Sequence, residues 1–286
     1  MQTVNTLSML RSATNELRRP GETIGLVPTM GALHEGHLTL MREAAKHCDH
    51  VAASIFVNPT QFGEGEDLDA YPRQLAEDSA MLEAEGVALL WAPTVDEMYP
   101  NGFASSISVS GVSSNFCGAD RPGHFDGVAT VVCKLFNQVR PDKAFFGEKD
   151  WQQLAVIRTM ARDLDLMQPV VDDIIGVPTV REGDGLAMSS RNRYLNETDR
   201  ANAATLPLAM KDAIATIQSG ADVPASLSEL KRALIASGFS SVDYAALADA
   251  MSLQPLSTLG DAPARLLVAA RIGGTRLIDN MAVTPG

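Results

Sequence analysis

Two histidines stand three residues apart in a stretch that joins an apolar run to a helical pattern. This stretch, residues 28–37, reads Pro-Thr-Met-Gly-Ala-Leu-His-Glu-Gly-His. A helix start offers an anion its backbone N–H groups and the positive end of its dipole, and two imidazoles can both donate to phosphate oxygens. The pattern therefore indicates a phosphate site around His34 and His37. A pair of surface histidines that cap a helix is the alternative that the residues themselves leave open.

The same histidines do not have the spacing of a zinc metalloprotease. Those enzymes place two histidines at i and i+4 on one helix face with a glutamate between them, as His-Glu-x-x-His. Here the separation is i to i+3, and no obvious third ligand follows. The three cysteines, Cys48, Cys117 and Cys133, include no Cys-x-x-Cys pair. We therefore expect neither a metal site nor a disulfide framework.

Two amide side chains follow another apolar run. Asn58 and Gln61 flank a proline-stiffened turn. Each amide offers a donor and an acceptor, so the pair could hydrogen-bond a small polyol or carboxylate. Taken alone, the stretch also fits an ordinary turn, where these residue types are common.

A lysine stands at the start of a helical pattern in residues 146–153, Phe-Gly-Glu-Lys-Asp-Trp-Gln-Gln. The helix dipole disfavours a cation there, so a bound anion would explain Lys149. Asp150 fits equally well as the residue that caps the helix. Gln153 falls one turn further along, on the same face as Asp150.

Two hydroxyls and a guanidinium follow each other in Met-Ser-Ser-Arg, residues 188–191. Together they could wrap a polyphosphate, and Gly185 would let the loop move. A solvated linker is the alternative.

Apolar runs alternate with stretches of helical period from Thr23 to about Gly176, which is the pattern of a βαβ sheet. We expect strands over residues 23–28, 51–57, 87–93, 105–109, 143–146 and 170–177. We expect helices over residues 6–18, 37–47, 72–85, 123–139 and 151–164. The prediction is an α/β fold with a Rossmann-like, doubly wound parallel sheet. Ligands of such sheets bind beyond the carboxyl ends of the strands, where the four polar stretches lie.

The pattern changes after Pro178. Two Ala-rich helical segments, residues 196–219 and 225–237, precede two β-like runs, residues 265–271 and 275–283. Gly273-Gly274 between the runs predicts a hairpin. We therefore predict a larger domain over residues 1–176 and a smaller C-terminal α+β domain over residues 177–286.

Composition narrows the classes of function. The chain has 286 residues, of which 45% are hydrophobic and 20% charged, enough apolar material for a sizeable core. It has no uninterrupted apolar run of about 18 residues and no signal-type block at its start, so we expect a cytoplasmic protein. A net charge of −12 removes non-specific attraction to nucleic acid, so a phosphate ligand needs a local basic pocket.

Five segments together resemble the pantothenate synthetases, the pantoate–β-alanine ligase family. They are residues 28–37, 56–62 (Phe-Val-Asn-Pro-Thr-Gln-Phe), 121–128 (Arg-Pro-Gly-His-Phe-Asp-Gly-Val), 146–150 and 188–192. The resemblance covers nearly the whole chain, including residues 271–280. The His-x-Gly-His and Met-Ser-Ser-Arg elements also resemble the paired signatures of the wider nucleotidylyltransferase and class I aminoacyl-tRNA synthetase superfamily. Residues 168–173 look longer than is usual, and Trp151 stands where another aromatic residue is common.

The resemblance implies an AMP-forming ligase that makes pantothenate, a precursor of coenzyme A. Pantoate would attack the α-phosphate of ATP to give an enzyme-bound pantoyl adenylate, and β-alanine would then displace AMP. The resemblance also implies a homodimer formed through the first domain, and a second domain that acts as a lid. Mg²⁺ would neutralise the phosphates of ATP, held by them and by water rather than by a carboxylate cage.

By the same resemblance, three stretches and one residue would bind ATP. The implied ATP-binding residues are Met30, Gly31, Ala32, Leu33, His34, Glu35, Gly36, His37, Gly147, Glu148, Lys149, Asp150, Val180, Met188, Ser189, Ser190 and Arg191. The implied catalytic residues are His37, as proton donor, with His34 and Lys149. Asp150 would contact ribose, Val180 would contact adenine through its main chain, and residues 188–191 would close over the triphosphate.

The resemblance implies further contacts to the other substrates. Gln61 and Gln153 would hold pantoate, and Gln61 would also border β-alanine. Secondary candidates near the acceptor amine or pyrophosphate are Asn58, Arg121 and His124. Candidate outer-shell contacts to Mg²⁺ are Glu77 and Asp78.

Other functions remain as alternatives at this stage. A nucleotidylyltransferase that leaves AMP on its product would share the histidine and serine-arginine elements without needing the two glutamines. A non-catalytic ATP sensor would keep the fold alone. A metal hydrolase would use His34, His37 and His124. A thiol nucleophile at Cys117 has nothing in the sequence to orient it towards His124.

Overall fold

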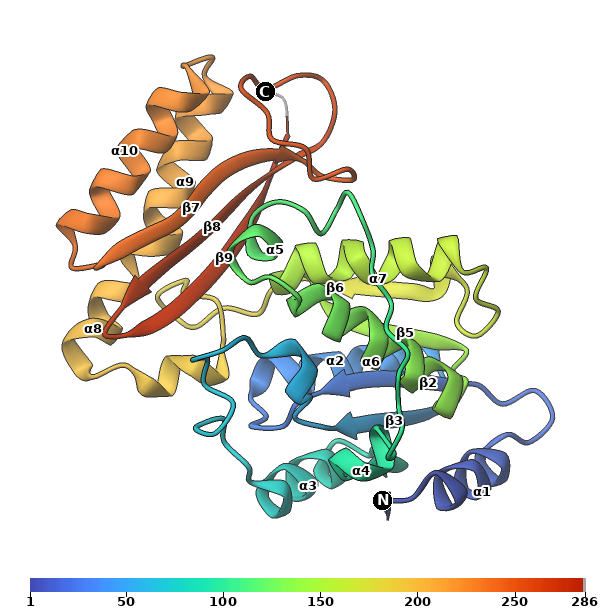
Figure 1. The fold of residues 1–286 in the computed structure, drawn as a ribbon. Coiled ribbons are helices and arrows are strands. Elements are labelled where there is room, and N and C mark those ends of the chain that lie inside the picture. Colours follow the sequence, from blue (N-terminus) through green and yellow to red (C-terminus); the bar gives the residue numbers. More distant parts are fainter. Residues whose placement is uncertain (285–286) are drawn as a thin grey trace. The chain divides into compact units, whose positions relative to one another are not determined.

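The computed structural model describes residues 1–284 of the chain, which form two compact units (Figure 1). The first unit comprises residues 1–113, 121–148 and 153–178. The second comprises residues 114–120 and 149–152 together with the chain from residue 179 onward. A single cut after residue 176 therefore does not describe the division, because two short earlier segments fold with the second unit.

The first unit is built on a six-stranded sheet in the order β1-β4-β3-β2-β5-β6, and every neighbouring pair is parallel. The strands are β1 (Gln2–Val4), β2 (Ile24–Thr29), β3 (His50–Ile55), β4 (Leu89–Trp91), β5 (Lys143–Gly147) and β6 (Ile174–Val177). This arrangement confirms the predicted α/β fold with a doubly wound parallel sheet.

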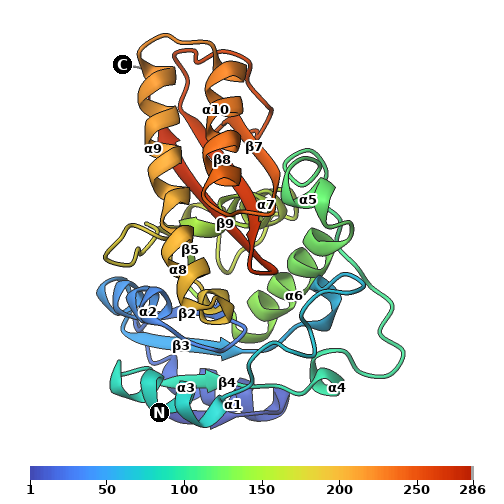
Figure 2. The same cartoon turned by 90° about the vertical axis from the view of Figure 1, so that its left-hand side faces the viewer.

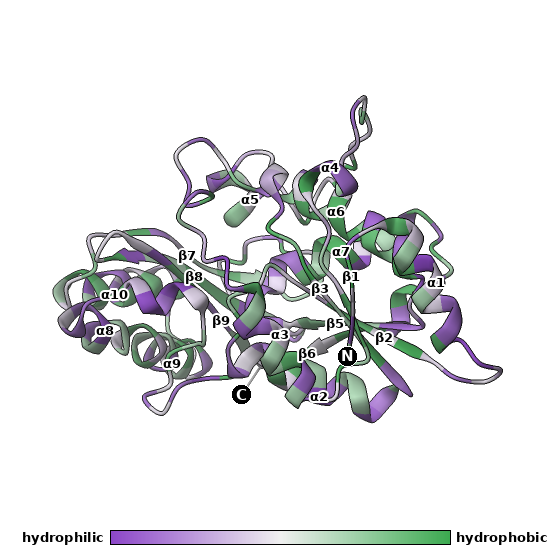
Figure 3. Ribbon diagram, turned by 90° about the horizontal axis from the view of Figure 1, so that it is seen from below, coloured by the Kyte–Doolittle hydropathy of each residue, from purple (hydrophilic) through white to green (hydrophobic). Residues whose placement is uncertain are grey.

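Helices cover both faces of this sheet. They are α1 (Leu7–Leu17), α2 (Glu35–His47), α3 (Leu75–Ala84), α4 (Val95–Met98), α6 (His124–Val139) and α7 (Trp151–Asp163). One core cluster joins α2 and α3 to alternate strand residues such as Val27 and Val51. The strand residues between them point to the opposite face, where α1 and α6 pack together. Figure 3 shows hydrophilic and hydrophobic residues alternating along the helices, as a half-buried helix requires.

Two expected strands of this unit need correction. Residues 105–109 form no strand, because Ile107 N–H donates to the Thr130 side chain at 2.8 Å and no strand of the described chain runs beside them. The run 170–177 is a strand only from Ile174 onward, and Val171–Asp173 forms a short 3₁₀ helix before it. The strand β1 and the helix α4 have three and four residues, too few for a periodic pattern to indicate them.

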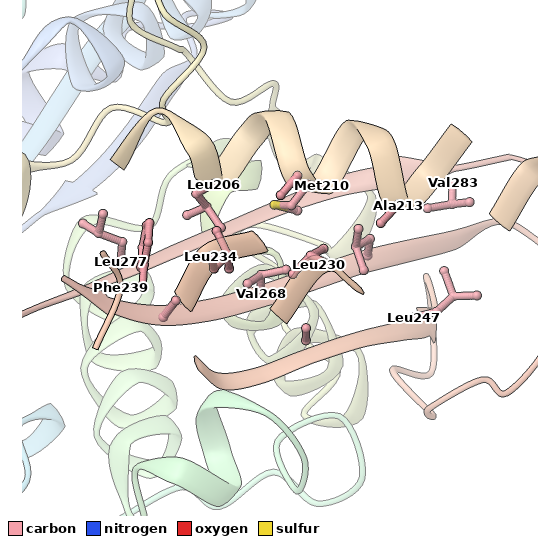
Figure 4. Close-up of a cluster of buried hydrophobic side chains, with 14 of the residues drawn as sticks. Leu206, Met210, Ala213, Leu230, Leu234, Phe239, Leu247, Val268, Leu277 and Val283 are labelled. Carbon is pink, nitrogen blue, oxygen red and sulfur yellow. The ribbon is translucent and has the colours of Figure 1, made fainter. Parts of the chain in front are cut away.

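The second unit carries an antiparallel sheet of β7 (Ser241–Asp249), β8 (Ala264–Ile272) and β9 (Thr275–Val283), in that order. Its helices are α5 (Cys117–Asp120), α8 (Glu197–Ala203), α9 (Thr205–Gln218) and α10 (Val223–Ala236). Apolar side chains of α9 and α10, including Met210 and Leu230, meet Val268 and its neighbours in one cluster (Figure 4). Figure 2 shows α9 and α10 side by side along the sheet.

The hairpin predicted at Gly273-Gly274 joins β8 to β9. Both glycines have positive φ, 54° and 76°, as the tight turn of a two-residue hairpin requires. One expected helix, 196–219, is instead two helices that meet at Ala204. Pro207 explains the break, because it has no N–H for the carbonyl four residues earlier and would clash with it in a continuous helix.

The strand β7 was not predicted from the sequence. Its residues, Ser-Val-Asp-Tyr-Ala-Ala-Leu-Ala-Asp, are mostly Asp and Ala, two types that disfavour strands when judged locally. Pairing with β8 along the whole length of β7 decides the outcome. Cys48, Cys117 and Cys133 are all free thiols. Within residues 1–284, no helix is both long and apolar enough to cross a bilayer.

Candidate active site

The strand order of the first unit creates a topological switch point between β2 and β5. From β2 the chain moves outward through β3 to β4, whereas from β5 it moves to β6 on the other side. Loops that leave such neighbouring strands diverge at their carboxyl ends and open a crevice there. The loop after β2 begins at Met30, and Glu148 follows β5 directly, so both predicted stretches start at this point.

A buried carboxylate from α3 holds the loop after β2. The Asp78 side chain is 1% exposed and accepts the N–H groups of Ala32 and Leu33, each at 2.9 Å. The Gln74 amide also donates to it at 3.2 Å. Gly31 and Ala32 turn through positive φ, and a Cβ on Gly31 would lie 2.9 Å from an Asp78 oxygen. Both oxygens of Asp78 thus lie under the loop and accept N–H groups.

The two imidazoles form the cap of α2. The Nδ1 atom of His34 accepts the Gly36 N–H at 3.1 Å, and the Nδ1 atom of His37 accepts the His34 N–H at 3.3 Å. Their rings lie 4.1 Å apart. Because each Nδ1 is an acceptor, the neutral rings carry their proton on Nε2. Capping and phosphate binding are therefore compatible, since different nitrogens serve the two purposes.

Glu35, which lies between the two histidines in sequence, forms an ion pair on the protein surface. Arg42 donates to both Glu35 and Glu85. The hydrogen bonds to Glu85 and then Glu35 raise the pKa of Arg42 above its ordinary value. Glu35 and Arg42 thus form an ion pair along the exposed side of α2.

The predicted amide pair forms part of a buried network. Asn58 is 1% exposed, and its amide donates to the Gln61 side-chain oxygen at 3.1 Å. Its own oxygen accepts from Thr60 at 2.9 Å and from the Tyr99 hydroxyl at 2.8 Å. Burial raises the pKa of Tyr99, so this phenol stays protonated and donates. The Gln61 amide is left to donate to the Met30 sulfur at 3.1 Å, beside the loop after β2.

A glycine of α6 allows this network to form. The Gly127 carbonyl accepts from the Asn58 amide at 3.2 Å. A Cβ on Gly127 would stand only 2.3 Å from the Thr60 carbonyl oxygen and 2.7 Å from the Gln61 nitrogen. No side chain fits in that space, so only glycine lets α6 approach the turn.

Arg121 and His124 brace the same turn from the other side. The Nδ1–H of His124 donates to the Gln61 carbonyl at 2.8 Å, and Arg121 donates to the His124 Nε2 at 3.0 Å. Arg121 also pairs with Glu66. Burial raises the pKa of Glu66, but the hydrogen bonds and charge of Arg121 lower it more, and the net pKa lies below its ordinary value.

In the second unit, the turn that carries Lys149 is fastened to the antiparallel sheet. The Lys149 carbonyl accepts from the Asn280 amide at 2.8 Å. Trp151 donates to the Ala250 carbonyl at 2.9 Å, and the Arg265 guanidinium stacks 3.4 Å from the Trp151 ring centre. The ammonium group of Lys149 is 4.0 Å from the neighbouring Asp150 carboxylate.

The loop that carries the serine-arginine stretch, residues 188–191, folds back on itself. Met188 N–H donates to the Val180 carbonyl at 3.0 Å, and Arg181 and Ala187 form a short antiparallel bridge. The Ser189 hydroxyl then accepts the Arg191 N–H at 3.3 Å and caps a 3₁₀ helix. The main chain of Val180 is thus already engaged on its carbonyl side.

The predicted residues therefore divide into groups. In the first unit, the two histidines share one cap, and Asn58, Gln61, Arg121 and His124 share one network. Gln153 is half-buried near the start of α7, and among residues 1–284 no hydrogen bond joins it to that network. In the second unit, Lys149 and the 188–191 loop each contact β9 or its neighbours.

Several of the residues that hold these groups were not predicted from the sequence. They are Gln74, Gly127, Arg181, Arg265, Asp279 and Asn280. The one available signal was two adjacent polar residues, Asp279 and Asn280, inside an otherwise apolar strand. The described residues contain no group of three or more His, Cys, Asp or Glu side chains placed to hold a metal ion.

A doubly wound parallel sheet with a histidine-capped helix at its switch point defines an α/β enzyme of the nucleotide-binding kind. The model of one family, pantoate-beta-alanine ligase, matches residues 2–282. The chain belongs to the pantoate–β-alanine ligase family, whose members ligate pantoate and β-alanine with ATP.

Relatives of known name agree along the full length. Pantothenate synthetase of Novosphingobium aromaticivorans is 70% identical over 285 residues and covers 100% of both chains. That of Sphingopyxis alaskensis is 58% identical and covers 99% of this chain and 100% of the relative. A crystal structure of pantothenate synthetase from Thermus thermophilus aligns over 100% of both chains with a TM-score of 0.92 and 48% identity.

A further crystal structure contains ligands. Pantoate–β-alanine ligase of Francisella tularensis, complexed with β-γ ATP and β-alanine, has a TM-score of 0.82 and 34% identity. It covers 98% of this chain, which covers 97% of it in turn.

Proposed function

We propose that this chain joins pantoate to β-alanine through a pantoyl adenylate and releases AMP. The observation that carries the proposal is membership of the ligase family across residues 2–282. The alternative function from the sequence, a nucleotidylyltransferase that keeps AMP on its product, has no family match of this kind to support it.

The chemistry needs positioning more than a covalent nucleophile. A pantoate carboxylate oxygen attacks the α-phosphorus of ATP, and the bond to the β-phosphate oxygen breaks to release pyrophosphate. The free amine of β-alanine then attacks the acyl carbon, the bond to AMP breaks, and the amine loses a proton. A carboxylate is a poor acyl electrophile, and adenylation supplies its leaving group. The protein must mainly align the reactants and screen phosphate charge.

In the first unit, we assign the phosphates to the loop at residues 30–37. His34 and His37 would donate through Nε2, because their Nδ1 atoms accept the N–H groups of the helix cap. His37 is the proposed proton donor to the departing pyrophosphate. Asp78 contributes by fixing the loop, since its oxygens accept the N–H groups of Ala32 and Leu33.

In the second unit, we assign Lys149 to phosphate and Asp150 to ribose. Ser189, Ser190 and Arg191 would bind the triphosphate through hydroxyl and guanidinium groups. Met188 and Val180, whose backbones are joined by one hydrogen bond, would also contact the nucleotide. Val180 would contact adenine through its main chain, whose carbonyl also accepts from Met188. Gly147 and Glu148, which belong to the first unit, would contact the nucleotide at the end of β5. The lid role of residues 177–286 stays a prediction.

We assign pantoate to Gln61 and Gln153, and β-alanine to the neighbourhood of Gln61. Asn58 and His124 both contact Gln61, one at its side chain and one at its carbonyl. We therefore propose that Asn58, His124 and Arg121 orient Gln61 rather than touch a substrate.

Mg²⁺ enters the proposal as part of the nucleotide. Both Asp78 oxygens accept N–H groups, and Glu77 is exposed on α3, so neither forms a preformed carboxylate cage. Phosphate oxygens and water would hold the ion, as is usual for Mg²⁺ in nucleotide sites. No side chain is assigned to it.

We also propose that the chain forms a homodimer through its first unit. Residues 103–110 lie mostly exposed with no neighbouring strand in the described chain. An exposed segment without a neighbouring strand is a template for pairing with a second copy. Light scattering should give the mass of two chains, and the mass of one chain would contradict the proposal. The expected cytoplasmic location stays a prediction.

An omission assay tests the function. Purified protein with pantoate, Mg·ATP and β-alanine should release free AMP, and omission of any one substrate should abolish that release. Pantoate and ATP alone should exchange labelled pyrophosphate into ATP. AMP that stays on the product would support the nucleotidylyltransferase instead. A folded sample that binds ATP but shows no exchange would end the enzyme proposal.

A further inference from the structure

Two adjacent polar residues are buried in the middle of β9. Asp279 is 2% exposed and Asn280 is 4% exposed. Because side chains alternate along a strand, the two point to opposite faces of the sheet. Asp279 pairs in register with Val268, which belongs to the helix-covered core, and Asn280 pairs with Leu267 on the other face. A strand that only filled a core would not bury polar groups on both sides.

Asp279 contacts the loop that carries the serine-arginine stretch. Arg181 donates to its two oxygens at 2.7 and 3.0 Å, which is the paired geometry that a guanidinium and a carboxylate prefer. Arg181 also donates to the Gly185 carbonyl at 3.0 Å. Since Arg181 and Ala187 form the bridge at the base of this loop, the ion pair fixes the base on which residues 188–191 stand.

Asn280 contacts the turn that carries the lysine. Its amide donates to the Lys149 carbonyl at 2.8 Å, and its oxygen accepts from Arg265. Arg265 in turn stacks on Trp151, two residues beyond the lysine. The Asn280 N–H donates to an Asp279 oxygen at 2.7 Å, so the two side-chain systems also meet each other.

We propose that Asp279 and Asn280 are a pair of positioning residues that fix the Lys149 turn and the 188–191 loop to one rigid strand. The proposal rests on the assignment of Lys149 and residues 188–191 to ATP made above. Neither Asp279 nor Asn280 is assigned a substrate contact. Their effect is to hold two phosphate-binding segments, far apart in sequence, at a fixed separation within the second unit.

Positioning of this kind makes a prediction that a purely structural role does not. An error of about 1 Å in a catalytic group can cost about 10²-fold in rate, although the fold survives. Loss of the Asn280 contact should therefore affect steps that involve ATP and leave pantoate recognition unchanged. Loss of a merely structural contact should lower stability and leave the kinetic constants of the folded fraction unchanged.

The sharpest variant is Asn280→Asp. It keeps the shape of the side chain and the oxygen that accepts from Arg265, but a carboxylate oxygen cannot donate to the Lys149 carbonyl. We expect the KM for ATP in pantoate-dependent pyrophosphate exchange to rise about tenfold or kcat to fall by a similar factor. The KM for pantoate should change less than about twofold. Ala282→Ser, an exposed position on the same face of β9, is the matched control and should leave all constants unchanged.

Arg181→Lys tests the other arm, because an ammonium keeps the charge but loses the paired geometry. If both arms act through β9, the double variant with Asn280→Asp should lose less than the product of the two single losses. If Asn280→Asp does not fold, Asn280→Ser, with its smaller side chain, takes its place. Thermal unfolding of every variant reports the folded fraction.

Lys149→Ala, assayed in parallel, distinguishes failure of the assignment of Lys149 to phosphate from failure of the positioning role of Asp279 and Asn280. Normal exchange in Lys149→Ala would overturn the assignment of Lys149 to phosphate. Impaired exchange in Lys149→Ala with unchanged constants in both Asn280 variants would overturn the positioning pair. Equal rises in the KM values for ATP and pantoate would overturn it as well.

Discussion

The two regions to which phosphate binding is assigned are built in different ways. The loop at residues 30–37 depends on Asp78, which accepts backbone N–H groups 45 and 46 residues away in sequence. The loops of the second unit depend on Asp279 and Asn280, which contact residues 98 and 131 positions away. The first region is held by a carboxylate that accepts backbone N–H groups of the loop, and the second by strand side chains that contact a guanidinium and a backbone carbonyl.

The two buried aspartates make the contrast concrete. Asp78 is satisfied by N–H donors of the loop and an amide, whereas Asp279 is satisfied chiefly by the Arg181 guanidinium. A backbone donor cannot be replaced by substitution, so the first arrangement tolerates change in the loop's side chains. The second requires two particular side chains, Arg181 and Asp279, to be kept together.

The largest effect is expected from the phosphate-binding groups themselves. His37→Ala and Lys149→Ala should each lower the rate of pantoate-dependent pyrophosphate exchange by about 10²–10³-fold, because each removes a donor aimed at developing phosphate charge. Circular dichroism should show that both variants remain folded. Normal exchange in one variant would mean that only the other region acts on phosphate.

The second effect is on stability and compares the two aspartates directly. Asp279→Ala leaves Arg181 without its paired carboxylate and should lower the free energy of unfolding by about 3 kcal/mol. Asp78→Ala leaves two buried N–H groups without an acceptor and should cost about 2 kcal/mol. Urea titration of both variants measures the difference. If Asp78→Ala lost more free energy of unfolding than Asp279→Ala, the ion pair would be the weaker of the two arrangements, contrary to the prediction.

The third effect concerns pantoate, which is assigned to glutamines of the first unit alone. Gln153→Ala removes hydrogen bonds to pantoate and should raise its KM about tenfold, the equivalent of about 1.4 kcal/mol. The KM for ATP should stay within about twofold. Gln218→Ala, on α9 of the second unit, is the control. An unchanged pantoate requirement in Gln153→Ala would remove this residue from the assignment.

The smallest effect is a dependence of stability on pH in the first unit. Arg121 holds the pKa of Glu66 below its ordinary value of 4.5, so ionised Glu66 stabilises the fold above that pH. The contribution is lost as the pH falls through the folded-state pKa. Glu66→Gln should therefore be less stable than the parent by less than about 1 kcal/mol near neutral pH, with the gap closing below about pH 4.5. A gap that persists in acid would point to lost packing rather than charge.

Local sequence pattern was sufficient for most of the first unit. The strands β2, β3 and β5 and the helices α2, α6 and α7 follow from runs and periods of apolar residues, and their alternation predicted the parallel sheet. The hairpin between β8 and β9 followed from two glycines that accept positive φ. Pattern failed where partners decide. Residues 105–109 have strand-like alternation but no neighbouring strand among residues 1–284, whereas β7 has a neighbour but little alternation.

The candidate site shows the same division. The kinds of residue and their places after strands are local facts, so the histidines, Lys149 and the serine-arginine stretch could be selected from the sequence. The supporting contacts could not. Asp78 was named only through the resemblance, as a candidate near Mg²⁺, and no local signature tells that it accepts the N–H groups of Ala32 and Leu33.

The sequence by itself determined most of the longer strands and helices of the first unit, and which polar groups stand beside them, since both depend on the order of neighbouring residues. Only the tertiary structure decided the strand order, the approach of α6 allowed by Gly127, and the contacts of Asp78, Asp279 and Asn280. Each of these joins residues distant in the chain. Their free energy comes from desolvated contacts that exist only once the sheets have formed, and no local pattern records them.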